Sequence, residues 1–150
     1  LTGSYFFNEL IKSINNSKYL VYSVQYQWKW NVHERFSRVQ QLGLAITNAK
    51  KRNVDVKVIL NQESPRRNIS KINSITNDEL SRSGVNVKML RAYSLLHTKL
   101  WIIDGLETFI GSHNISGRSL GANEEVSVKI VSKDFAKYML GYFDNLWNTP

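Results

Sequence analysis

Three times in its first 90 residues the chain repeats one pattern, an amphipathic helical stretch followed by a short apolar stretch typical of a β-strand. Repetition of this kind predicts a sheet covered by helices, because each element must bury its apolar side against another layer. The predicted helices span residues 5–14, 34–51 and 69–80, and the predicted strands span residues 18–26, 54–60 and 85–90.

The pattern changes after residue 97, where strands follow one another. Residues 98–104 and 107–113 read as two strands joined across Asp104-Gly105, a dipeptide favoured in tight hairpin turns. Residues 124–131 alternate as a further strand, and an amphipathic helix is predicted after a Ser132 cap. The sequence therefore predicts an α/β fold with a mixed, largely parallel β-sheet sandwiched by helices.

Length and composition narrow the possibilities further. The 150 residues fit a single domain over positions 1–150, and the absence of cysteine excludes disulfides, thiolate metal sites and cysteine nucleophiles. The apolar runs are shorter than the roughly 18 residues of a spanning helix, so the chain as given is expected to be soluble and not to contact a membrane. Its compartment stays open, cytoplasmic or exported with a removed N-terminal segment. A net charge of +8 favours polyanionic partners.

The hairpin carries an unusual number of polar side chains. Since alternate side chains of a strand share a face, His97 and Lys99 are expected on one face, roughly 7 Å apart. Ser112 and Asn114 share a face by the same argument, and His113 turns away. If the two strands pair across the Asp-Gly turn, the four polar groups converge near one end of the hairpin.

Such a group of side chains suits a phosphate. A lysine supplies a point charge, serine and asparagine donate neutral hydrogen bonds, and an imidazole can attack phosphorus or move a proton. This chemistry predicts a site that works without a metal or another cofactor.

The spacing of these residues closely resembles the signature of the phospholipase D superfamily. The pattern H-x-K-x4-D-x6-G-S-x-N is met by His97, Lys99, Asp104, Gly111, Ser112 and Asn114. Segments AITNAKKRNVDVKVIL and SGVNVKML are also similar to that family, so the resemblance covers nearly the whole chain. It implies a phospholipase D-like fold and catalytic roles for the motif residues. For Asp104 a structural role at the hairpin tip is the preferred interpretation.

The resemblance implies two further features of the site. A carboxylate after the motif orients the nucleophilic histidine, and residues 123–125 (NEE) favour Glu125 over Glu124 for that role. Members of the superfamily also build one active site from two motifs, whereas this chain has one H-x-K. A homodimer with a composite site is therefore expected. One His97 would attack phosphorus and the other would protonate the leaving oxygen, with a pH optimum near or below neutrality.

The leading functional hypothesis is a metal-independent phosphodiesterase or endonuclease that cleaves nucleic acid, preferably single-stranded, through a phosphohistidine. One alternative is a phospholipase D or cardiolipin hydrolase acting on phospholipid, for which the same site would serve. Others are a non-cleaving nucleic-acid-binding module, or a catalytic domain excised from a larger nucleic-acid enzyme such as a restriction endonuclease.

Candidate nucleic-acid contacts lie outside the motif. Trp28 and Trp30 are expected on one face with Tyr22, Val24 and Tyr26. Core or dimer packing is the favoured interpretation, and the alternatives are a stacking surface for bases or a lip that contacts lipid. Basic residues that could bind flanking phosphates, or simply be solvated, are Arg66, Arg67 and Arg118.

Overall fold

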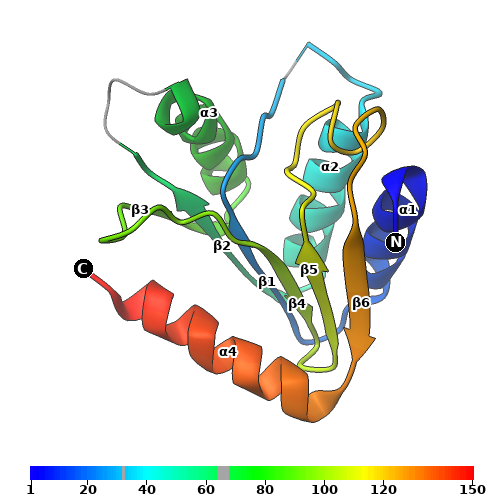
Figure 1. The fold of residues 1–150 in the computed structure, drawn as a ribbon, viewed down its shortest axis with the longest axis vertical. Helices are drawn as coiled ribbons and strands as arrows, with labels where there is room; N and C mark the ends of the chain where they lie inside the picture. Colours follow the sequence, from blue (N-terminus) through cyan, green and yellow to red (C-terminus); the bar gives the residue numbers. More distant parts are fainter. Residues whose placement is uncertain (32, 64–67) are drawn as a thin grey trace.

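The computed structural model describes residues 1–31, 33–63 and 68–150. Helices and strands alternate at first and give way to three consecutive strands, as the sequence pattern predicts (Figure 1). The elements are α1 (Gly3–Asn16), β1 (Leu20–Gln25), α2 (Arg38–Lys51), β2 (Asp55–Asn61), α3 (Asn68–Arg82), β3 (Asn86–Leu90), β4 (Lys99–Ile103), β5 (Glu107–Gly111), β6 (Ser127–Val131) and α4 (Lys133–Asn148).

The strands form one six-stranded sheet in the order β3-β2-β1-β4-β5-β6. Strands β1, β2 and β3 run parallel, whereas β4 pairs with β1 antiparallel and β5 and β6 continue antiparallel. The sheet is mixed, as expected, but three of its five pairings are antiparallel, so the expectation of a largely parallel sheet is wrong. The turn of residues 104–106 between β4 and β5 is too short for a parallel crossover, and the longer connection of residues 112–126 between β5 and β6 contains no helix that would make one.

Helices cover both faces of the sheet (Figure 1). Apolar residues of α1, α2 and α3 pack against one face, and those of α4 pack against the other. Alternation along β1 divides its side chains between the layers, since Val21 faces the three helices and Tyr22 and Val24 face α4.

Trp28 and Trp30 belong to the layer of α1, α2 and α3, opposite to Tyr22 and Val24. The expectation of a shared face is wrong because β1 ends at Gln25 and its alternation does not continue to the tryptophans. The Trp28 side chain is fully buried and only 8% of Trp30 is exposed, so the stacking-surface alternative is wrong and core packing is observed.

The strand directions create two distinct ends. The start of β4, the end of β5 and the start of β6 share one end of the sheet with the last residues of β1. This end lies uppermost in Figure 1, and the β4–β5 turn lies at the opposite end. Polar residues flanking these strands are therefore brought together although they lie far apart in the sequence.

Candidate active site

Five of the predicted site residues line a single open cavity of about 560 Å³ at the upper end of the sheet. His97 immediately precedes β4, Lys99 begins it, and the residues after β5 and before β6 complete the lining. The antiparallel register of β4 and β5 produces the convergence that the Asp-Gly turn predicted. The lining residues are His97, Lys99, Gly111, Ser112, Asn114, Glu125 and Val126.

Lys99 is buried and His97 is exposed at the cavity. The Lys99 Nζ donates to the His97 carbonyl oxygen at 2.7 Å. Burial lowers the pKa of Lys99, against the opposing influence of the Glu125 charge. Desolvation, helped by the nearby Lys99 charge, lowers the pKa of His97. The lowered pKa of His97 favours the neutral imidazole, which is the form that a histidine nucleophile needs.

Tyr26 also belongs to the site, although the sequence placed it only among possible packing residues. Its ring centroid lies 4.5 Å from that of His97, and the Lys99 Nζ lies 5.1 Å from the same ring centroid. The Tyr26 backbone N–H donates to the Thr98 carbonyl at 2.9 Å. Tyr26 thus packs against both motif side chains and fixes the backbone between them.

A buried amide on α3 holds Tyr26 in place. Asn73 is fully buried, and its Nδ2 donates to the carbonyl oxygens of Tyr26 at 2.9 Å and Asn61 at 2.8 Å. Its Oδ1 accepts from the Trp28 backbone N–H at 2.9 Å. The sequence gives little indication that Asn73 supports Tyr26, because it shows only an asparagine within a predicted amphipathic helix. A buried amide of this kind needs hydrogen-bond partners, which here are backbone groups.

Glu125 is held by serine hydroxyls. Ser112 Oγ donates to its carboxylate and accepts from the Val126 backbone N–H at 3.0 Å, and Ser119 Oγ donates to the other carboxylate oxygen at 2.8 Å. Partial burial alone would raise the pKa of Glu125, but these hydrogen bonds, with one from Asn123, hold it below its usual value. Ser119 was not anticipated, and within the described chain Glu125 forms no hydrogen bond with His97.

Gly111 and His113 have structural explanations. A Cβ on Gly111 would lie 2.2 Å from Ser127 Oγ and 2.4 Å from the Val126 carbonyl oxygen, so the glycine permits close approach of β6. His113 is buried and turned away from the cavity, as expected, with Nδ1 2.7 Å from Ser127 Oγ.

Asp104 lies at the far end of the hairpin and does not line the cavity, which fits the preferred structural interpretation. Strand β4 separates it from Lys99 by roughly 16 Å. Its carboxylate accepts from the backbone N–H groups of Lys18 at 2.9 Å, Tyr19 at 2.8 Å and Leu20 at 3.1 Å. It joins the turn to the start of β1.

The remaining candidates differ in position. Arg118 is exposed at the rim of a groove beside the cavity. Arg66 and Arg67 lie outside the described residues. In the described part of the chain, no group of three or more His, Cys, Asp or Glu side chains is arranged to hold a metal ion.

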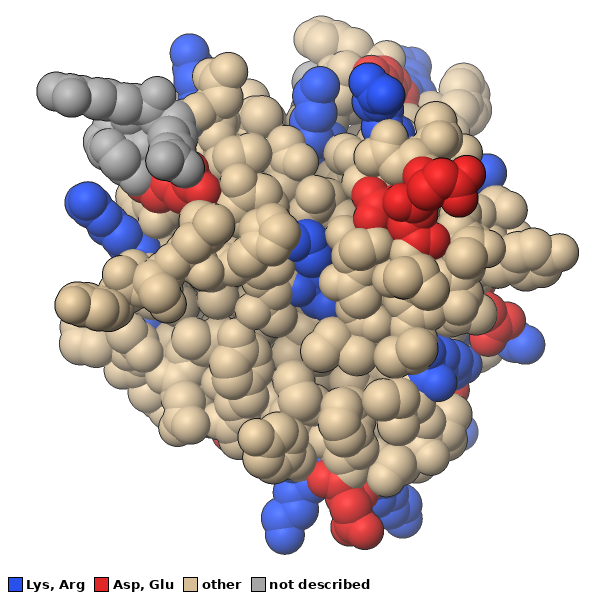
Figure 2. Space-filling model, viewed as in Figure 1, with Lys and Arg blue, Asp and Glu red and all other residues tan. Residues whose placement is uncertain are grey.

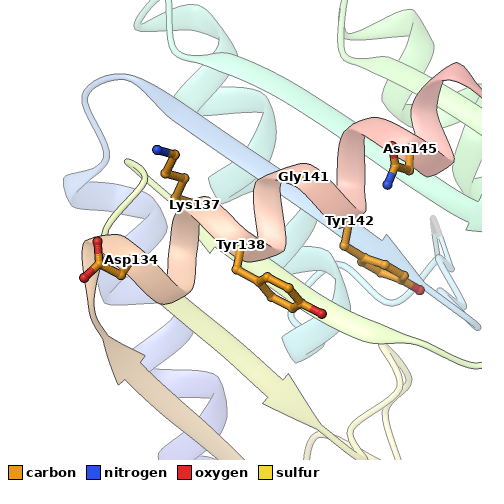
Figure 3. A pocket seen from close by; sticks show the side chains of 6 residues that line it. All are labelled: Asp134, Lys137, Tyr138, Gly141, Tyr142 and Asn145. Atoms are coloured by element: carbon orange, nitrogen blue, oxygen red, sulfur yellow. The ribbon is translucent and has the colours of Figure 1, made fainter.

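A separate hollow of about 580 Å³ lies along α4, where the rings of Tyr138 and Tyr142 project from one side of the helix (Figure 3). No predicted site residue lines it. Tyr142 still connects α4 to the motif, because its hydroxyl lies 2.8 Å from Thr98 Oγ. None of the described helices has the length and hydropathy that crossing a bilayer requires.

Comparison with known proteins places this site in a family. Residues 10–147 match the family described as "Cardiolipin synthase, PLD-like domain". Cardiolipin synthase A of Escherichia coli O157:H7 is 37% identical over 95 residues, which are 61% of this chain and 18% of that protein. The chain therefore spans less than a fifth of the length of the curated relatives that it matches.

Solved structures show the same fold. Nuc of Salmonella typhimurium, a phospholipase D family member, superposes with a TM-score of 0.78 at 21% identity, over 94% of this chain and 86% of Nuc. NucT of Helicobacter pylori gives a TM-score of 0.73 at 20% identity, over 98% and 92% of the two chains. The expected phospholipase D-like fold is thus confirmed. With its sequence match, fold and motif-lined cavity, the chain belongs to the phospholipase D superfamily, in the family of cardiolipin synthase PLD-like domains.

Proposed function

We propose that this domain is a phosphodiesterase that cleaves nucleic acid, single strands in preference, without a metal ion. The observation that carries the proposal is the convergence of His97, Lys99, Ser112 and Asn114 around one open cavity. A nucleophile, a buried cation and neutral hydrogen-bonding groups are the parts that phosphoryl transfer requires.

The proposed reaction has two steps. The neutral His97 imidazole attacks phosphorus, so that an N–P bond forms, the P–O bond to the leaving group breaks, and a second histidine gives its proton to the leaving oxygen. Water then attacks the phosphohistidine and gives a proton to the second histidine, which the first step left neutral, while the N–P bond breaks and His97 is released. Lys99, with Asn114, stabilises the negative charge that grows on the equatorial oxygens.

The second histidine comes from a second copy of the chain in this proposal, because one chain supplies a single lining histidine, His97, to the cavity. The bonding of Glu125 supports a composite site. Its carboxylate is held by Ser112 and Ser119 and does not reach His97 of its own subunit, so a site built by two subunits gives it another imidazole to orient. Light scattering after gel filtration should show a dimer under conditions of turnover, and an active monomer would contradict the composite site.

Nucleic acid is favoured by charge. Each chain carries +8, and twice that, +16, in a dimer would attract a polyanion. Basic side chains stand near the upper margin of the face in Figure 2, with acidic groups among them. The second candidate is phospholipid hydrolysis, favoured by the cardiolipin synthase relatives.

The test is cleavage of labelled single-stranded DNA and RNA in excess EDTA, beside hydrolysis of cardiolipin in vesicles by the same preparation. We expect polymer cleavage by the wild-type protein, its loss in His97→Ala, and no lipid turnover. Lipid hydrolysis with intact polymers would favour the second candidate. A folded dimer that cleaves none of these substrates would contradict both.

A further inference from the structure

A groove of about 660 Å³ adjoins the cavity and shares Asn114 with it. We propose that it binds the stretch of single-stranded nucleic acid next to the scissile phosphate, with a neighbouring phosphate held by Lys29 and Arg118. This inference rests on the proposed function and identifies the surface that would select a polynucleotide over a smaller phosphodiester.

One wall of the groove consists of residues 27–29, which form backbone hydrogen bonds with Ile115 outside the six named strands. Trp28 and Ile115 form an isolated parallel bridge, and both side chains are fully buried in the core. The Lys29 backbone N–H donates to the Ile115 carbonyl at 2.7 Å, and the Ile115 N–H donates to the Gln27 carbonyl at 3.0 Å. Because alternate side chains point to opposite sides, Gln27, Lys29 and Asn114 face the groove.

Another part of the lining is a closely bonded turn. The Arg118 carbonyl accepts from the backbone N–H groups of Ala122 at 2.7 Å and Asn123 at 2.8 Å, and the Ser119 N–H donates to Ser116 Oγ at 3.3 Å. These bonds fix the backbone from which the exposed Arg118 side chain projects. Lys29 and Arg118 thus project from two separately bonded backbone segments that line one groove. Because the backbone is already fixed, less conformational entropy is lost when a ligand binds.

The lining decides which part of a substrate fits. Every described lining residue is polar, charged or glycine, so the groove offers an acyl chain no apolar side chain to pack against. Lys29 and Arg118 match a phosphate, and the amides of Gln27 and Asn123 can donate to and accept from base or sugar groups. Glu34, bonded to Asn31 Nδ2 at 2.9 Å, disfavours an anion at its own margin.

The experiment measures binding separately from turnover. A His97→Ala background prevents cleavage, and fluorescence anisotropy of a fluorescein-labelled oligothymidylate reports affinity over a series of KCl concentrations. The double variant Lys29→Ala/Arg118→Ala is compared with Lys12→Ala/Lys18→Ala, which removes the same charge from the opposite end of the sheet. We expect the groove variant to bind roughly tenfold or more weakly, with the log–log salt slope reduced by about 0.7 for each phosphate that is no longer neutralised.

Equal weakening by the two double variants would overturn the inference, because the effect would then be one of net charge alone. Unchanged affinity in the groove variant would overturn it directly. Cleavage by the protein with intact His97 tests the proposed function independently. If the protein cleaves the polymer and the groove variant binds the oligonucleotide with unchanged affinity, the groove proposal is rejected and the proposed nuclease function is kept. If the groove variant binds more weakly but the protein with intact His97 cleaves no polymer, the groove proposal is kept and the nuclease function is rejected.

Discussion

At the scale of single residues, Lys99 is a charged side chain that is buried at the cavity. Only 8% of it is exposed, and its ammonium donates to a carbonyl and lies over the Tyr26 ring without an ion pair to any described carboxylate. A buried charge without an ionic partner destabilises the fold. An anion in the cavity would supply that partner, so the cost is consistent with a phosphate-binding role.

We therefore predict that Lys99→Met increases the stability of the free protein while it abolishes cleavage. The apolar side chain has a similar volume and removes the charge, so the free energy of unfolding should rise by about 1 kcal/mol. Denaturant unfolding measures this change, and the exposed Lys12→Met serves as the control. Destabilisation by several kcal/mol would show instead that the hydrogen bond to the His97 carbonyl dominates.

His113 provides a pH-dependent contribution to stability. Burial lowers its pKa, and its ring stacks on Phe6 with centroids 4.1 Å apart. Because the folded pKa lies below the unfolded value of about 6.5, the unfolded chain takes up a proton first as the pH falls. The stability that neutral His113 contributes is present above that pH and is lost as the pH falls through the lowered folded pKa.

The corresponding prediction is that His113→Gln flattens the decline in stability between neutral pH and about pH 5. The variant should be less stable overall, since glutamine cannot stack on the Phe6 ring. Urea unfolding at several pH values measures the slope, beside the exposed His33→Gln. An unchanged slope would mean that His113 does not control this transition.

At the scale of elements, the two ends of the β4–β5 hairpin differ: one lines the cavity and the other bonds the start of β1. The open end carries the cavity residues, and the turn carries Asp104, which adopts a left-handed backbone conformation (φ 53°) and binds three consecutive backbone N–H groups. The tip therefore anchors the hairpin to the start of β1.

We expect Asp104→Ala to lower the free energy of unfolding by about 1–2 kcal/mol and to leave the kcat of the folded protein nearly unchanged. Asp104→Asn should lose less, because asparagine keeps one acceptor and tolerates the left-handed conformation. Thermal unfolding and cleavage rates measured on both variants separate the effects. A loss of turnover at full stability would return Asp104 to the catalytic residues.

The sequence predicted where the helices and strands lie more accurately than which of their side chains are buried. Every predicted helix and strand occurs, and the period-two argument correctly grouped the polar residues of the hairpin. In α3, however, the isoleucines at positions 69, 72 and 75, which recur at helical spacing, do not mark the buried side. Ile75 is 48% exposed, while Asn73 and Thr76 are fully buried. These polar side chains bond the backbone of residues 26–30, and periodicity of apolar residues cannot reveal such partners.

At the scale of the whole molecule, the site depends on contacts between distant parts of the chain. Asn73 and Tyr26 lie 47 positions apart, and Thr98 and Tyr142 lie 44 apart. A local motif locates the reacting groups, because their spacing is fixed within one hairpin, but it does not name the residues that support them from other elements. The motif likewise does not name the second histidine of the proposed site, since that histidine would come from another copy of the chain.

A composite site predicts a particular mixing behaviour. When wild-type and His97→Ala subunits are refolded together, activity should fall with the square of the wild-type fraction, because only dimers with two intact subunits contain both histidines. Wild-type protein refolded alone at each dilution controls for recovery. Activity proportional to the wild-type fraction would indicate that each subunit acts alone.

The separation of the two ends of the sheet also makes the domain convenient to label. The chain contains no cysteine, so a single introduced thiol would be chemically unique. Ser83, exposed in the turn between α3 and β3, lies at the end of the sheet away from the cavity. A dye attached at Ser83→Cys would therefore report subunit association by energy transfer while leaving the cavity and its groove open.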